Sequence, residues 1–272
     1  MHMVDFEYNG TRLSDFGLKM FNINGIEDII DISNKITINH VKAPNATKYL
    51  MTSSEYDETF SVNFQVCKVT CDSIGEDSLS DAEINYIARW LNRKRYYKFR
   101  PIYDDGSFIN VYYYGTFNIQ LIKFGEAVIG LDLTLNTNAP YGFIDEIKYK
   151  CSLPNTSAKF TMSDNSDEIG YLYCDATIKC LGGGDLTIKN ELDPDNTIII
   201  KNCSGNEIIT MHGDSKIIQS SLSTHKTLPN DFNYNYLRII NTADKNKNVF
   251  SSNIPCEMTF SYSPIRKVGI VI

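Results

Sequence analysis

The sequence predicts a mainly β protein with one helix, arranged as two domains. Only one stretch, residues 80–95, combines a helix start signal with apolar residues at helical spacing. Apolar and polar residues then alternate along Phe117–Leu121 and Ile129–Leu135, as they do in half-buried strands. From residue 144 onward, short β-branched segments are separated by turn residues. With 272 residues, 42% of them hydrophobic, the chain is long enough for two cores.

The predicted helix begins at a capping box. Ser80 is the expected N-cap, and Glu83 three residues later can bond back to the backbone of Ser80. Leu79 and Ile84 are spaced for a hydrophobic staple across this start. Basic residues crowd the last expected turn, where they suit the negative end of the helix dipole. One apolar face is expected to hold Ile84, Ile87, Ala88, Trp90 and Leu91.

The remainder of the N-terminal domain, residues 1–143, reads as strands and turns. Asn9-Gly10 and Asn24-Gly25 are both two-residue hairpin signals, because asparagine and glycine tolerate positive φ. Apolar and polar residues alternate from Ile36 to Val41, and again from Phe60 to Val66. Asp104-Asp105-Gly106 predicts a further hairpin turn.

The C-terminal domain, residues 144–272, is expected to be an antiparallel β-sandwich without a helix, since short strands and turns follow one another regularly. The clearest alternation is in the last strand. The expected strands are 158–162, 176–180, 185–189, 197–201, 207–211, 216–219, 236–240 and 256–262.

Charge and cysteine content limit the classes of function. The net charge is −7, and neither domain is basic, so a nucleic-acid-binding domain is not expected. No apolar run approaches the roughly 20 residues that span a bilayer, so membrane insertion is not expected either. Val4–Lys19 does not read as a signal peptide. The seven cysteines are irregularly spaced, which favours free thiols in a reducing compartment.

Three polar segments resemble ligand sites but fit turns better. Gly182-Gly183-Gly184 lacks the rest of a phosphate-binding loop and precedes an aspartate. Ser163–Glu168 and Asp193–Asn196 are acidic, yet neither has the spacing of a calcium loop. Aspartate and asparagine are ordinary turn formers.

The histidines also suggest no catalytic centre. His2, His40, His212 and His225 form no recognised metal motif, and no G-x-S-x-G elbow supplies a nucleophile. His212 lies next to Gly213-Asp214, which suits a solvated turn better than a base with its orienting acid. The sequence therefore predicts no enzyme, with no catalytic, cofactor-binding or metal-binding residues and no cofactor.

Two groups of aromatic residues suggest binding alternatives. Asn92–Arg100 interleaves basic and aromatic residues, as nucleic-acid surfaces do, but a helix end running into a buried strand is favoured by the acidic balance. The second domain could bind carbohydrate through aromatic side chains on one face, although such residues are more often structural. The candidates are Tyr171, Tyr173, Phe232, Tyr234 and Tyr236.

Several stretches resemble one known family, the distal tail proteins of long-tailed bacteriophages and prophages. The resemblance is strongest in WLNRKRYYKFRPIYDDGSFINVYYYGTFN and LIKFGEAVIGLDLTLNTNAPYGF, which together span much of residues 90–143. It continues in the opening FEYNGTRLSDFGL and the closing PCEMTFSYSPIRKVGIVI. Within the second domain, EIITMHGDSKIIQS and FNYNYLRIINTADKN are similar to strands of the family.

The resemblance implies a structural virion protein at the tail tip, assembled in the bacterial host cytoplasm. Family members form a ring, usually a hexamer, that joins the tail tube protein to the tail-tip hub of the baseplate. The first domain builds the ring, while the second, a galectin-like sandwich, projects outward and can carry a receptor-binding protein.

Two further expectations follow from the resemblance. DNA only passes through the channel of the ring, and the acidic chain suits that passage. Residues 266–272 are expected to return to the first domain.

The alternative hypothesis is that the protein is a carbohydrate-binding β-sandwich module in host adsorption.

Overall fold

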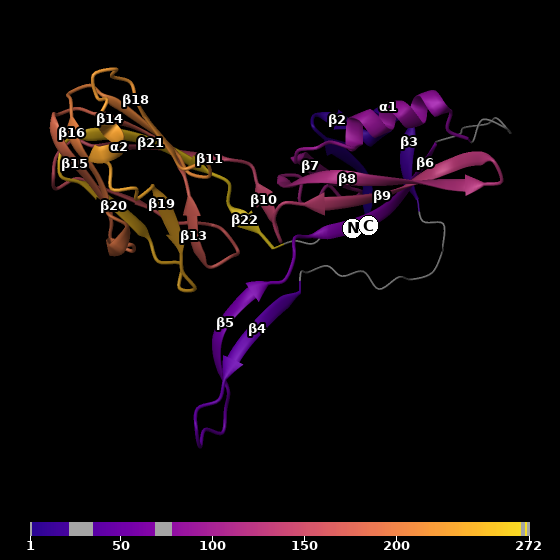
Figure 1. Ribbon diagram of the computed structural model, residues 1–272, viewed down its shortest axis with the longest axis horizontal. Helices are drawn as coiled ribbons and strands as arrows, with labels where there is room; N and C mark the ends of the chain where they lie inside the picture. The colour runs from indigo at the N-terminus through magenta and orange to yellow at the C-terminus, as the bar shows by residue number, and fades with distance from the viewer. Residues whose placement is uncertain (1, 22–34, 69–77, 268–269, 271–272) are drawn as a thin grey trace. The chain divides into compact units, whose positions relative to one another are not determined.

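A computed structural model describes residues 2–21, 35–68, 78–267 and 270 (Figure 1). The chain divides into two compact units, one of residues 1–144 with 266–272 and the other of residues 145–265. Both are built of antiparallel sheets, so the predicted mainly β fold is confirmed. No helix in the described part of the chain is long and apolar enough to cross a membrane.

The first unit is organised by a nine-stranded sheet. Seven strands lie in the order β2-β1-β7-β8-β9-β6-β3, while β10 pairs with β8 and β22. A 3-10 turn, Leu13–Phe16, connects β2 to β3. The strands are β1 (Met3–Tyr8), β2 (Thr11–Arg12), β3 (Leu18–Phe21), β6 (Ser61–Lys68), β7 (Tyr97–Tyr103), β8 (Val111–Phe124), β9 (Ala127–Thr137), β10 (Gly142–Ile144) and β22 (Ile265–Arg266).

The turn signals of the first unit have different outcomes. Asn9 and Gly10 adopt φ of 52° and 81° and connect the paired strands β1 and β2, as predicted. Asn24-Gly25 lies outside the described residues. Asp104-Asp105-Gly106 does form a turn, with Gly106 at φ 69°. The connection from β7 nevertheless continues to residue 110 before β8 begins, so it is longer than a tight hairpin.

Helix α1 spans Asp81–Leu91, and its start is the predicted one. The hydroxyl of Ser80 accepts a hydrogen bond from the Glu83 backbone, and the Glu83 carboxylate accepts one from the Ser80 backbone. Its predicted end near residue 95 is wrong. Asn92 is extended (φ −81°, ψ 93°), and its side-chain amide donates to the carbonyl of Phe117 on β8. This tertiary hydrogen bond ends the helix before the basic residues.

Aromatic packing joins α1 to the sheet. The indole N–H of Trp90 donates to the carbonyl of Tyr8 on β1 at 3.0 Å. The same indole stacks on Phe16 at 4.4 Å and on Phe6 at 5.7 Å. Phe6 is fully buried and also contacts rings from three other strands. These rings form the centre of the first core, which therefore depends on residues from distant parts of the sequence.

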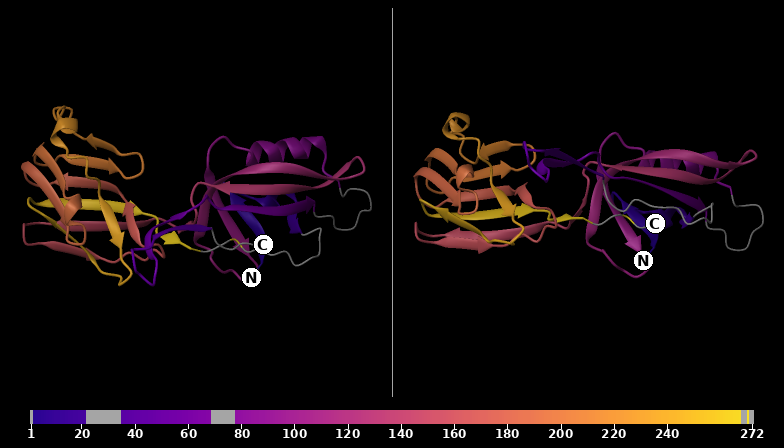
Figure 2. Two further views of the ribbon diagram at one scale, coloured as in Figure 1. Left: turned by 60° about the horizontal axis from the view of Figure 1, so that its bottom comes forward. Right: turned by 90° about the horizontal axis from the view of Figure 1, so that it is seen from below.

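The second unit contains a five-stranded sheet and a four-stranded sheet (Figure 2). The five-stranded sheet has the order β11 (Ile147–Leu153), β21 (Cys256–Tyr262), β14 (Asp175–Cys180), β17 (Ile208–His212) and β18 (Ile217–Ser220). The four-stranded sheet has the order β12 (Lys159–Met162), β20 (Asn248–Ser252), β15 (Gly184–Asn190) and β16 (Ile198–Cys203). A separate pair consists of β13 (Gly170–Tyr173) and β19 (Arg238–Asn241).

Both sheets contribute side chains to one core, as the predicted sandwich requires. Along β21, Cys256, Met258, Phe260 and Tyr262 are all buried. Three strands were not predicted: β11, β13 and β20. The expected absence of a helix from this domain is wrong in one place, because α2 forms a single turn at Leu228–Asp231. A second short turn, Pro194–Asn196, is of the 3-10 type.

The last described residues belong to the first unit. Arg266 ends β22, and Ile270 is fully buried in the first core. The six described cysteines are free, and all but Cys67 are buried. Cys71 lies outside the described residues.

The capping box gives a test of this fold. Ser80→Ala removes the hydroxyl that caps α1, and we expect the free energy of unfolding to fall by about 1 kcal/mol in chemical denaturation. Ser78→Ala, an exposed serine outside the helix, is the matched control and should have little effect. Equal stability of the two variants would contradict the assigned helix start.

Candidate functional site

The most exposed apolar feature of the described chain is the hairpin formed by β4 (Ile36–Val41) and β5 (Leu50–Tyr56). We call residues 36–56 the hairpin arm. Its two strands are antiparallel and pair from Ile36 opposite Tyr56 to Val41 opposite Leu50, with a bulge after Asn39. In the described chain these strands form a two-stranded sheet of their own. The arm therefore has two edges that no described strand covers.

The side chains of the arm are exposed on both faces. Every residue of β4 is exposed, although the strand alternates as a half-buried strand would. The most exposed apolar side chains are Ile36 (50%), Ile38 (56%), Val41 (52%), Tyr49 (61%), Leu50 (60%) and Met51 (64%). Alternation thus predicted the strand correctly, while the described part of the chain leaves its apolar face exposed.

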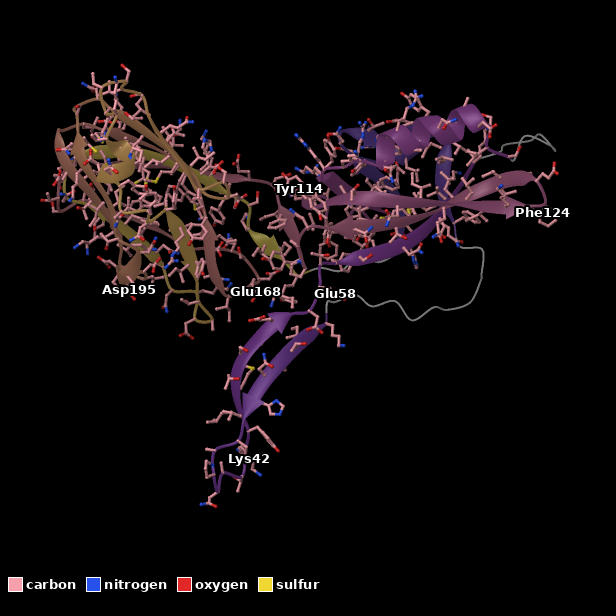
Figure 3. All side chains as sticks on the ribbon, in the orientation of Figure 1. Lys42, Glu58, Tyr114, Phe124, Glu168 and Asp195 are labelled. Carbon is pink, nitrogen blue, oxygen red and sulfur yellow. The ribbon has the colours of Figure 1, made fainter. Side chains whose placement is uncertain are left out.

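Local contacts stiffen the two ends of the arm. At its base, the ring of Tyr56 meets the ring of Tyr141 edge-on at 6.1 Å. Toward the turn, His40 packs edge-on against Tyr49 at 4.9 Å, and the ammonium of Lys42 lies 5.5 Å from the same ring (Figure 3). None of residues 36–55 belongs to either core.

A lone two-stranded hairpin is at best marginally stable in water. Exposed strand edges also pair readily with other strands, and contiguous apolar surface marks interaction sites. The arm has both properties, so its physical requirement is a partner that covers it. This makes the arm the candidate functional site of the first unit.

A second hairpin also ends in an exposed aromatic residue. The strands β8 and β9 pair to their last residues, Phe124 and Ala127, and Phe124 is 79% exposed at the tip (Figure 3). Unlike the arm, this hairpin is paired along much of its length with β6, through Gly130. It is therefore held by the sheet and has less need of a partner.

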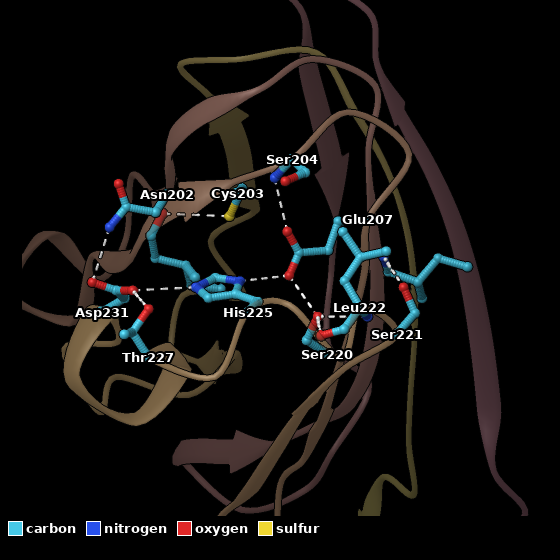
Figure 4. Close-up of polar contacts among 12 residues, drawn as sticks. Asn202, Cys203, Ser204, Glu207, Ser220, Ser221, Leu222, His225, Thr227 and Asp231 are labelled. Atoms are coloured by element: carbon cyan, nitrogen blue, oxygen red, sulfur yellow. Dashed lines mark hydrogen bonds and ion pairs between the residues drawn. The ribbon is translucent and has the colours of Figure 1, made fainter.

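The second unit contains a buried charged cluster that the sequence did not reveal. His225 lies between two carboxylates: its Nδ1 is 2.6 Å from Glu207 and its Nε2 is 3.3 Å from Asp231 (Figure 4). The side chains of His225 and Glu207 are 4% and 0% exposed. The hydroxyl of Ser220 donates to Glu207, and that of Thr227 donates to Asp231. The cluster joins β18 and α2 to Glu207, which directly precedes β17.

The three groups hold one another in their charged forms. Burial opposes the charge of His225, but the hydrogen bonds and charges of Glu207 and Asp231 outweigh it and raise the histidine pKa. Burial would raise the pKa of Glu207, yet hydrogen bonds from Ser220, Ser204 and His225 lower it. The pKa of Asp231 is lowered, mainly by Thr227. The raised pKa favours the imidazolium form of His225, in which both ring nitrogens donate to the carboxylates.

The other three histidines are not part of this cluster. His212 is the last residue of β17 and lies 3.7 Å from Asp175, at the edge of the turn where the sequence favoured a solvated histidine. Its side chain is 43% exposed. His40 is on the arm, and the backbone of His2 donates to Asp104. The cluster at His225 was missed because its carboxylates lie 18 and 6 residues away in sequence. A helix start signal that could have indicated α2 is Thr227 followed by Pro229, although the Thr227 side chain makes no capping hydrogen bond.

The polar turn segments have structural partners. Asp193 accepts two hydrogen bonds from the Arg238 guanidinium, at 2.6 and 2.9 Å. Asp164 accepts hydrogen bonds from the backbone and hydroxyl of Ser166. The glycine run lies between β14 and β15, where Gly184 adopts φ of 123°. Among the described residues, no three or more His, Cys, Asp or Glu side chains are grouped so that they could hold a metal ion.

After α1 the aromatic side chains of Tyr97 and Phe99 pack into the first core, while the basic residues 93–95 stay exposed. Phe99 is fully buried on β7, and Tyr97 is half-buried beneath the guanidinium of Arg93. Asn92–Arg100 is thus a helix end followed by a core strand, the structure that the sequence favoured.

The five candidate aromatics of the second unit follow one another in space. Tyr171 contacts Tyr173 at 5.7 Å, while Phe232 contacts Tyr236 at 5.2 Å and Tyr234 at 5.5 Å. Lys216 lies over the rings of both Tyr173 and Tyr236 and so joins the two groups. Phe232 and Tyr236 are buried, whereas Tyr171 and Tyr234 are 57% and 64% exposed. The row therefore presents exposed rings only at its ends.

Comparisons with known proteins give one consistent answer. Residues 1–139 match the family model of a phage tail protein N-terminal domain, and residues 141–262 match that of a phage tail C-terminal domain. Among solved structures, the chain is similar to the Dit protein (gp 19.1) of phage SPP1, which is described as a paradigm of the hub adsorption apparatus in phages infecting Gram-positive bacteria. No match was found among curated proteins.

The similarity to the SPP1 protein extends over nearly both chains. The TM-score is 0.61 at 12% sequence identity, and the alignment covers 96% of this chain and 98% of the other. At that identity the comparison establishes the fold. The resemblance to distal tail proteins that the sequence suggested is confirmed at this level.

The charged cluster makes stability depend on pH. Because the pKa of His225 is raised in the folded state, its contribution is complete below the unfolded value of about 6.5. It is lost as the pH rises through the folded value. We expect His225→Gln to lower the free energy of unfolding by about 2 kcal/mol at pH 6. The gap between variant and parent should narrow as the pH rises.

Chemical denaturation at a series of pH values measures this effect. His212→Gln, at an exposed histidine, is the control and should keep the parent's pH profile. If His225→Gln and the parent lose stability in parallel between pH 6 and 9, the imidazolium assignment is wrong.

Proposed function

Because the chain belongs to the phage tail protein family, we propose that it is a structural component of the tail tip that assembles into a ring through its hairpin arm. The ring stands at the distal end of the tail tube, as the resemblance to distal tail proteins implies. In this role the protein joins the tube to the tail-tip hub. The arm carries the proposal, since it is the described apolar surface with the clearest need of a partner.

The partner proposed for the arm is a neighbouring copy of the same chain. A ring is built from heterologous contacts, in which one patch of each subunit meets a different patch of the next. An extended arm suits such a contact, because it can reach across a neighbour while its base stays fixed at Tyr56 and Tyr141. The exposed strand edges of the arm add backbone hydrogen bonds to apolar burial. Six copies are the proposed number, as is usual in the family.

The two units are proposed to divide the work. The first unit forms the ring and faces the tail tube protein and the hub protein. The second unit, a galectin-like sandwich, projects outward and carries a receptor-binding protein. DNA passes through the channel without a specific site, and the net charge of −7 supports free passage because like charges repel. The protein would be assembled in the host cytoplasm and act in the virion.

The proposed role needs no catalysis, cofactor or metal. The geometry of the charged cluster supports this, because both nitrogens of His225 are bound to carboxylates and neither is available to move a proton. A general base must reach the proton that it abstracts. The cluster instead fixes α2 to the strands around it.

A charge on the arm tests the proposal. Ile38 is 56% exposed in the protomer, so Ile38→Lys leaves the fold of the protomer intact but would place a charge in the subunit contact. We expect the parent to form rings in negative-stain images and a high-mass species by light scattering. The variant should weaken self-association at least tenfold at equal concentration.

The matched control is Ile169→Lys, since Ile169 is 61% exposed and lies in the second unit. It should assemble like the parent. Where isolated chains stay monomeric, the same comparison is made with the tail tube protein added, which can template the ring. Equal assembly of Ile38→Lys and the parent in both settings contradicts the proposed contact.

A further inference from the structure

The second unit carries an alternating stack of tyrosine rings and cations. In spatial order its members are Tyr171, Arg238, Tyr173, Lys216 and Tyr236, which we call the tyrosine–cation ladder. The guanidinium carbon of Arg238 is 4.4 Å from the Tyr171 ring centre and 5.9 Å from that of Tyr173. The ammonium of Lys216 lies over Tyr173 and 5.1 Å from the Tyr236 ring centre. Cations at such distances are attracted by the faces of the rings.

Strand pairing sets the first half of the ladder. Tyr171 and Tyr173 are two residues apart on β13, so their side chains point to the same side. Arg238 lies directly opposite Tyr173 in the pairing of β13 with β19. Asp193 holds the guanidinium by two hydrogen bonds, and a third runs to the Tyr173 hydroxyl at 3.5 Å. Two of its five N–H donors remain after these described contacts.

The turn between β17 and β18 places Lys216. A Cβ on Gly213 would lie 2.8 Å from the carbonyl oxygen of Cys174, so only glycine lets the turn approach β14 this closely. The backbone of Gly213 donates to Asp175, and the hydroxyl of Tyr236 donates to the carbonyl of Lys216 at 2.5 Å. Lys216 itself adopts φ of 55°. Three separate contacts thus fix an exposed lysine over an aromatic ring.

The charges of the ladder do not balance. Asp193 neutralises Arg238 through a bidentate pair, whereas Lys216 has no ion pair among the described residues. Partial desolvation and the charge of Arg238 lower the pKa of Lys216, while Asp214 acts in the opposite direction. An anion at Lys216 would relieve this unfavourable environment.

Tyr171 provides the apolar part of a binding surface. Its ring is 57% exposed at the open end of the ladder, and the guanidinium of Arg238 lies over it. A flat, exposed aromatic ring suits the C–H face of a sugar or polyol ring, and the remaining Arg238 donors suit its hydroxyl groups. One net positive charge suits a single anionic group. A nucleic acid strand, by contrast, is held by several phosphate contacts.

We propose that the tyrosine–cation ladder binds an anionic glycan, with one sugar ring on Tyr171 and a carboxylate or phosphate group from a neighbouring unit of the same glycan at Lys216. Five aromatic residues were candidates for carbohydrate binding on the basis of the sequence. The proposal places the sugar ring on one of them, Tyr171, at one end of the row. It does not depend on ring assembly, because all five members of the ladder lie in the second unit. A failure of one proposal therefore leaves the other standing.

Isothermal titration calorimetry of the full chain tests this site with four probes. They are an oligosaccharide of uronic acids, an oligomer of glycerol phosphate, a neutral oligosaccharide of similar length and a single-stranded DNA oligonucleotide. We expect one or both anionic glycan probes to bind, and the affinity to fall as salt is added. The probe that binds distinguishes a carboxylate from a phosphate source. The neutral sugar and the DNA should bind at least tenfold more weakly.

Two substitutions assign the binding to the ladder. Tyr171→Ala removes the exposed ring, and Lys216→Gln removes the unpaired charge; each should lower the affinity at least tenfold. The matched controls are Tyr234→Ala, at an equally exposed tyrosine, and Lys201→Gln, at an exposed lysine of β16. Thermal unfolding checks that every variant is folded. If Lys216→Gln does not fold, Tyr171→Ala alone tests the site.

The proposal is wrong if neither anionic glycan binds at millimolar concentration. It is equally wrong if Tyr171→Ala leaves binding unchanged, or if the DNA binds more tightly than both glycans.

Discussion

A pair of strands cannot bury its own apolar side chains, and the assembly proposed for the hairpin arm follows from this constraint. A β-sheet hides its apolar face only against a second layer. In the first unit, the second layer is α1, whose buried face includes Trp90. In the second unit, each of the two main sheets covers the apolar face of the other. The hairpin arm has no second layer in the described chain. Its apolar side chains are therefore evidence for assembly, and family membership indicates the phage tail as the place.

The second unit uses polar side chains in two different ways. In the cluster of Glu207, His225 and Asp231, the side chains of Glu207 and His225 are buried and each charged group has an oppositely charged partner at short distance, so its role is to fasten α2. The ladder ends at a half-exposed ring and contains a lysine without an ion pair among the described residues. Satisfied polar networks specify a fold, whereas exposed and unbalanced groups mark binding surfaces.

The sequence predicted features that depend on nearby residues. The cap at Ser80 and Glu83, the turn at Asn9-Gly10 and the alternation of β21 are each set within a few positions. The fold class and the family resemblance followed from many such local patterns. The end of α1 was predicted wrongly because a hydrogen bond from Asn92 to Phe117, 25 residues away, decides it.

The candidate sites depend on distant residues, and this is why only fragments of them could be predicted from the sequence. Alternation predicted the strand at Ile36–Val41 but not its exposure, which depends on what the rest of the chain leaves uncovered. His225 meets carboxylates from two other elements, so no local motif announces it. The aromatic candidates included three members of the ladder. Their cations, Lys216 and Arg238, join them only through the fold.

The most direct test of the account is amide hydrogen exchange of residues 36–56 before and after assembly. In the free protomer, a two-stranded hairpin with open edges should exchange rapidly. If the arm is the contact between copies, its amides should become strongly protected in the assembled ring, while β15 and β16 of the second unit stay unchanged. Rapid exchange of the arm in the fully assembled ring would contradict the account.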